Sequence, residues 1–103
     1  MIGRFTILYA EDDADDLFMV KQAFEKHDHI EIIHALNGLE ALELLDEMSA
    51  NNDRPCLVIL DINMPKLDGR ETLVRIKEDE KTREIPVVKT LRSYTRLFKK
   101  DDR

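Results

Sequence analysis

The sequence predicts an α/β fold built on a doubly wound parallel sheet. Three observations support this: short apolar runs alternate with amphipathic segments, the central run at 57–60 is apolar throughout, and acidic residues follow two of the runs. A strand buried on both faces has a continuous apolar sequence, and such strands are typical of parallel sheets covered by helices. Right-handed crossovers then place helices on both faces of the sheet.

The first half of the chain supplies two strands and two helices. A β-forming run at 5–10 predicts the first strand, and apolar residues at helical spacing predict a helix over about 14–27. Residues 31–35 predict the second strand. Asn37 is the expected N-cap of the second helix, because Glu40 stands three residues later, as in a capping box.

The second half supplies the central strand, one helix and a fourth strand. Asp61 closes the central run, at the edge of the sheet where open α/β sheets bind their ligands. Asp68 is expected to cap a third helix that ends in the charged segment 78–84. Residues 85–88 then begin the fourth strand.

Length and composition describe one small acidic domain. A chain of 103 residues suffices for a single core, and 16 Lys and Arg against 22 Asp and Glu give a net charge of -6. This charge argues against binding to a nucleic-acid backbone and favours a protein partner or a cation. The one cysteine, Cys56, stands at the head of the central run, which predicts a buried thiol. Without a signal peptide or an apolar stretch of roughly 20 residues, we expect a cytoplasmic chain with no membrane partner.

The end of the chain differs in charge from the rest. Residues 89–103 hold six Lys and Arg and two Asp and Glu, whereas residues 1–88 hold 10 basic and 20 acidic side chains. We therefore predict a domain over 1–88 and a basic C-terminal tail over 89–103, which extends the fourth strand and continues as helix or disorder. A sheet of four strands leaves the fourth with an open edge, which a second chain could cover by pairing or strand exchange.

Three acidic residues are expected to meet at one edge of the sheet. Glu11 and Asp12 follow the first strand and Asp61 ends the third, and these two strands are neighbours in the expected order. Three carboxylates this close repel one another unless a cation neutralises them, and oxygen-only ligands suit Mg²⁺. Once a metal screens the charge, one carboxylate can act as the nucleophile in phosphoryl transfer and form an acyl phosphate.

The same segments resemble the receiver domain of two-component response regulators. The resemblance covers residues 5–88 and rests on the acidic pair after the first strand, then on Asp61 followed by Met64-Pro65 and Asp68-Gly69. It implies a flavodoxin-like sheet of order 2-1-3-4, with the fifth strand and the last helix of the family missing.

The resemblance also implies a role for each site residue. Asp61 would be the phosphoacceptor, and Glu11, Asp12 and Asp61 would bind Mg²⁺ together with the backbone carbonyl of Asn63. The phosphoryl group would come from a histidine kinase or a phosphotransfer protein. The chain would be a signalling module and not an enzyme; an aspartate-nucleophile phosphatase needs a general-acid Asp where Asn63 stands.

The sequence departs from the family after the fourth strand. Receivers carry a Ser or Thr five positions beyond the proline that corresponds to Pro86, and that position is Leu91 here. Thr90 is one residue early, and a shift of one residue along a strand turns the side chain to the other face. The Lys-Pro pair of the family is also missing. A second interpretation therefore stays open: a degenerate, non-switching receiver that acts as a protein-interaction or dimerisation module.

Two further patterns predict no site. His27 and His29 follow the first helix and His34 alternates along the second strand, so all three are expected to be solvated surface residues. The acidic run at 11–16 lacks the glycine and the terminal glutamate of an EF-hand calcium loop.

Overall fold

The structure, a computed structural model, describes residues 5–61 and 68–90. The strands are β1 (Phe5–Ala10), β2 (Ile30–Ala35), β3 (Leu57–Asp61) and β4 (Val87–Thr90). The helices are α1 (Ala14–Phe24), α2 (Gly38–Ala50) and α3 (Gly69–Glu78). In these residues strands and helices alternate as the sequence predicts.

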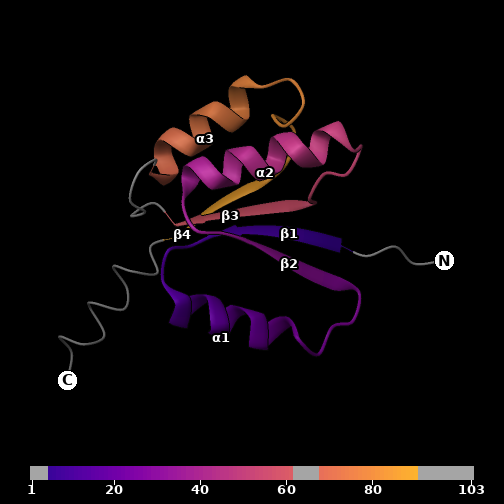
Figure 1. The fold of residues 1–103 in the computed structure, drawn as a ribbon, viewed down its shortest axis with the longest axis vertical. Coiled ribbons are helices and arrows are strands. Elements are labelled where there is room, and N and C mark those ends of the chain that lie inside the picture. Colours follow the sequence, from indigo (N-terminus) through magenta and orange to yellow (C-terminus); the bar gives the residue numbers. More distant parts are fainter. Residues whose placement is uncertain (1–4, 62–67, 91–103) are drawn as a thin grey trace.

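The four strands form one parallel sheet in the order β2-β1-β3-β4, which confirms the predicted order. Figure 1 shows α1 on one face of the sheet and α2 and α3 together on the other. This arrangement is the doubly wound α/β architecture, in which right-handed crossovers that run in opposite directions along the sheet cover opposite faces. β1 and β3 are the inner strands of the described sheet, so each is paired on both sides.

The hydrophobic core lies between the sheet and the helices α2 and α3. Its strand residues alternate with residues that face α1, as the period of two along a strand requires. The core residues are Leu8, Ala10, Ala35, Ala41, Leu45, Val58, Leu60, Ile76 and Ile85. Leu8, Val58, Leu60 and Ile76 are completely buried. Both inner strands are therefore anchored from this face.

Two helices begin at the caps that the sequence predicts. The Asn37 Oδ1 atom accepts a hydrogen bond of 2.8 Å from the Glu40 backbone N–H, and Asp68 Oδ1 accepts one of 2.9 Å from Glu71. The Glu40 carboxylate bonds the Leu36 N–H at 2.6 Å, one residue before the N–H that a standard capping box uses. These caps fix where α2 and α3 start and so how the preceding loops leave the sheet.

Cys56 is exposed, so the prediction of a buried thiol is wrong. Its backbone N–H bonds the Thr6 carbonyl oxygen at 2.9 Å, but β3 begins only at the next residue. The apolar run therefore starts before the part of the strand that is covered on both faces. The side chain of Cys56 lies at the end of the sheet, where it faces solvent.

Two predicted boundaries shift. α1 ends at Phe24 and not at 27, because the chain turns there with backbone bonds from His27 to Phe24 and from Ile30 to His27. β4 begins at Val87 and not at 85, and it extends to Thr90 within the tail, as the predicted extension of the fourth strand requires; the rest of the tail, 91–103, lies outside the described residues. No helix in the described part of the chain is long and apolar enough to cross a membrane.

Candidate functional site

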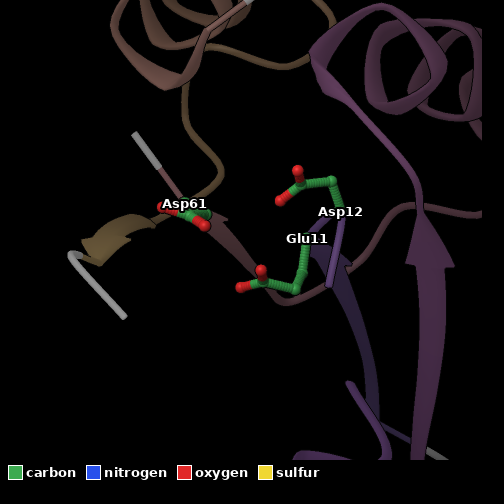
Figure 2. A group of neighbouring side chains, drawn as sticks. All are labelled: Glu11, Asp12 and Asp61. Carbon is green, nitrogen blue, oxygen red and sulfur yellow. The ribbon is translucent and has the colours of Figure 1, made fainter. Parts of the chain in front are cut away.

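Three carboxylates meet at the edge of the sheet where β1 and β3 end. Asp61 is the last residue of β3, and Glu11 and Asp12 directly follow β1. The register pairs Ala10 with Leu60, which brings Glu11 level with Asp61. One carboxylate oxygen of each acid lies within 4.8 Å of those of the other two. Figure 2 shows Glu11 and Asp12 extending from the end of β1 toward Asp61. The predicted meeting of these acids is therefore present in the structure.

The three acids differ in their exposure to water. Glu11 and Asp61 are both 0% exposed, whereas Asp12 is an exposed residue. A buried carboxylate is costly unless hydrogen bonds or a cation compensate for its lost hydration. Glu11 and Asp61 therefore form the buried part of the site, and Asp12 lies on the side that is open to solvent. A cation can enter from that side.

Glu11 is held by hydrogen bonds on its side chain and on its main chain. The Tyr9 hydroxyl donates to Oε1 and the Asp13 backbone N–H donates to Oε2, both at 3.2 Å. The Glu11 N–H donates to the Ala35 carbonyl at 2.9 Å, and the Glu11 carbonyl lies 2.6 Å from His34 Nε2. His34 is half-buried in this contact, so the prediction of a solvated surface histidine is wrong for it.

Asp13 has a structural role beside the three acids. It is the residue before α1, and its Oδ1 atom accepts a hydrogen bond of 2.8 Å from the Asp15 N–H. Its carbonyl accepts the first helical bond, from Leu17 at 3.0 Å. Asp13 therefore caps α1 in the manner of an N-cap residue, which separates it from the carboxylate cluster that precedes it.

The cluster has the donor set that Mg²⁺ prefers. Mg²⁺ binds oxygen ligands at about 2.0–2.1 Å in an octahedron and usually keeps several waters, so oxygens bound to one ion lie roughly 3–4 Å apart. Carboxylate oxygens that lie within 4.8 Å of one another reach such positions by small side-chain rotations or through a water. The residues present therefore fit a magnesium ion. Asn63, the fourth predicted ligand, lies outside the described residues.

Thr90 is the residue of β4 that pairs with Asp61. Register partners in a parallel pair point to the same face of the sheet, so Thr90 lies on the face of Asp61. Leu91, where the family carries its hydroxyl, lies outside the described residues.

Sequence reasoning missed Tyr9 and His34 as neighbours of the site. The signal for Tyr9 is its spacing, because residues two apart on a strand point to the same side, and Tyr9 stands two residues before Glu11. His34 carries no comparable local signal. Its contact depends on the register of β1 and β2, in which Tyr9 and His34 are partners.

Comparisons with known proteins agree with this fold and site. A family model described as the response regulator receiver domain matches residues 7–95. Response regulator Rcp1 of Synechocystis sp. is 40% identical over 86 residues, in a match that covers 80% of this chain and 58% of Rcp1. The chain belongs to the response regulator receiver domain family, and it spans 58% of the length of that relative.

Two solved structures of response regulators are similar. The phosphorylated cyanobacterial phytochrome response regulator RcpA matches with a TM-score of 0.78 and 31% identity, over 96% of this chain and 75% of RcpA. The Mn²⁺-bound form of response regulator Rcp1 matches with a TM-score of 0.73 and 36% identity, over 82% of this chain and 63% of that chain. Both have the flavodoxin-like receiver fold found here.

Proposed function

We propose that this chain is the phosphoacceptor module of a two-component phosphorelay and takes a phosphoryl group on Asp61. The observation that carries the proposal is the meeting of three carboxylates, from Glu11, Asp12 and Asp61, at the carboxyl ends of two parallel strands. Among its relatives, RcpA is described in a phosphorylated form and Rcp1 with a bound divalent metal, which supports the same chemistry here.

Asp61 is the best nucleophile of the three acids. Both oxygens of the Glu11 carboxylate accept hydrogen bonds, from the Tyr9 hydroxyl and the Asp13 N–H, which suits this side chain to hold a cation in place. Asp12 is exposed, so its carboxylate is hydrated. Asp61 is completely buried, and a carboxylate with less hydration around it loses less solvent when it attacks.

Mg²⁺ would be held by Glu11, Asp12, Asp61 and the backbone carbonyl of Asn63. When bound, the ion supplies positive charge that offsets the charges of the acids and of the phosphoryl oxygens. An Asp61 oxygen forms the new bond to phosphorus while the bond from phosphorus to the histidine nitrogen of the donor breaks, and that nitrogen keeps the electron pair. The product on Asp61 is an acyl phosphate.

The partners follow from this chemistry. The phosphoryl donor is a phosphohistidine on a histidine kinase or a phosphotransfer protein, and the site of action is the cytoplasm. The module acts by association and not as an enzyme with a substrate of its own.

A small phosphoryl donor tests the proposal directly. In the presence of Mg²⁺, we expect acetyl phosphate to add the mass of one phosphoryl group to the wild-type chain, because the carboxylate of Asp61 displaces acetate. Intact-mass measurement follows the adduct, which hydroxylamine should remove because it cleaves acyl phosphates. A chelator provides the control, since it leaves the three acids without a cation. A wild-type chain that stays unlabelled with Mg²⁺ present contradicts the proposal.

A second candidate function is dimerisation by a degenerate, non-switching receiver. The open edge of the strand β4 favours it. Within residues 5–61 and 68–90, β4 has a neighbouring strand only on the side of β3, and Val88 is 49% exposed. An open strand edge with an apolar side chain can pair with a second chain. This function predicts a dimer in light scattering at high concentration. A monomer that also labels normally on Asp61 counts against it.

A further inference from the structure

We infer that Tyr9 and His34 are positioning residues for the metal site. They form a cross-strand pair that holds Glu11 by its side chain and by its main chain and so sets the affinity of the site for a divalent cation. The inference rests on the proposed function, because it concerns the cation that the three acids would share. It adds two residues that contribute no ligand atom.

The pair reaches Glu11 from one face of the sheet. Tyr9 on β1 and His34 on β2 are register partners, and partners in a parallel pair point to the same face. The Tyr9 hydroxyl donates to Glu11 Oε1 at 3.2 Å, and His34 Nε2 lies 2.6 Å from the Glu11 carbonyl oxygen. A carbonyl oxygen can only accept, so the ring nitrogen of His34 carries the hydrogen in this bond.

The main chain of Glu11 is tied to β2 after β1 has ended. β1 stops at Ala10, yet the Glu11 N–H donates to the Ala35 carbonyl at 2.9 Å and the Glu11 carbonyl bonds the His34 ring. The peptide groups on both sides of the Glu11 Cα are therefore fixed to consecutive residues of the neighbouring strand. The chain can turn toward Asp12 only beyond this point.

The side chain of Glu11 is fixed in the same way. Its two oxygens accept from the Tyr9 hydroxyl and the Asp13 N–H, and the carboxylate is completely buried. Tyr9 is only 1% exposed, so little water can compete for its hydroxyl. These donors also offset part of the repulsion among the three acids. The carboxylate thus keeps one orientation toward Asp61 before a cation arrives.

Groups that orient metal ligands are known to set metal affinity. Loss of such a group typically weakens metal binding about 10–100-fold, because the ligand is then free to leave its binding orientation. A purely structural contact has a different signature, since its loss lowers the stability of the fold while the folded protein binds the ion as before. The two possibilities can be separated on the folded chain.

The experiment measures the Mg²⁺ dissociation constant of the full chain by calorimetry, with urea unfolding in the absence of Mg²⁺ as a separate measure of stability. His34→Leu removes the N–H donor and should weaken Mg²⁺ binding about tenfold. His34→Gln places an amide N–H at a similar reach and should bind nearly as the wild type does. His29→Leu is the control. It makes the same change at an exposed histidine directly before the first residue of β2, and it should leave the Mg²⁺ dissociation constant unchanged.

Tyr9→Phe is the variant that keeps the test valid if His34→Leu does not fold. It removes one buried oxygen and should weaken Mg²⁺ binding about tenfold, at the lower end of the same range. The inference is overturned if folded His34→Leu or Tyr9→Phe binds Mg²⁺ as the wild type does, or if His34→Gln binds as weakly as His34→Leu. A wild type that binds no Mg²⁺ contradicts the proposed function instead, so the two failures are distinguishable.

Discussion

We expect Asp61→Asn to abolish the phosphoryl adduct that acetyl phosphate and Mg²⁺ should form on the wild-type chain. The carboxamide lacks the anionic oxygen that attacks phosphorus, so no acyl phosphate can form at this position. Asparagine has nearly the shape of aspartate, and the substitution removes one of three negative charges whose oxygens lie within 4.8 Å of one another. The fold should therefore tolerate it. Intact mass after incubation measures the adduct, and circular dichroism checks the fold.

Asp46→Asn is the matched control for this loss. Asp46 lies on α2, and its side chain is 75% exposed, so the same chemical change occurs away from the three acids. This variant should label to the wild-type level. An adduct of undiminished yield on Asp61→Asn would assign the chemistry to another residue and remove Asp61 from its proposed role.

Asp12→Asn should remove the effect of Mg²⁺ on both labelling and stability. Asp12 is the exposed acid of the three, so its loss opens the cluster on the side where the ion enters. A ligand that binds only the folded chain stabilises it by about 1.4 kcal/mol at ten times its dissociation constant. At that Mg²⁺ concentration, we expect the free energy of unfolding of the wild type, measured with urea, to rise by this amount. The Asp12→Asn variant should gain none at the same Mg²⁺ concentration, and its labelling should fall to the level that the wild type shows with a chelator.

The sign of the change without Mg²⁺ provides a second test of the same variant. With no cation present, the three carboxylates repel one another, so removing one charge should leave Asp12→Asn at least as stable as the wild type. Asp15→Asn is the control, because Asp15 is an exposed acid in the first turn of α1 and does not belong to the cluster. It should keep the full Mg²⁺ increment. Equal Mg²⁺ stabilisation of Asp12→Asn and the wild type would contradict a cation at this site.

Much of this arrangement could be predicted from local sequence signals. The continuous apolar run before Asp61 predicts an inner strand, and the spacing of Asn37 and Glu40 predicts a helix start. Each of these signals is contained within a few neighbouring residues. That Glu11, Asp12 and Asp61 lie at one edge of the sheet then follows from strand order alone. Parallel neighbours bring their carboxyl ends to one edge of the sheet whatever their exact register.

Features that depend on register or on strand boundaries could not be predicted in the same way. A shift of one residue between β1 and β2 would turn His34 to the other face, and nothing in the sequence near His34 fixes that register. The exposure of Cys56 depends on where β3 begins, which an apolar run does not reveal. The contacts of Tyr9 and His34 with Glu11 are therefore visible only in three dimensions.

The position of β1 and β3 in the middle of the sheet has a consequence for fluctuations of the molecule. Residues Ile7, Leu8, Tyr9 and Ala10 of β1 are all buried, and β1 is paired along both of its edges. Amide hydrogens in such strands exchange with solvent only in the rarest openings, close to global unfolding. Glu11 and Asp61 continue directly from these two strands, so the main chain at both acids is displaced only in openings that also disrupt the sheet.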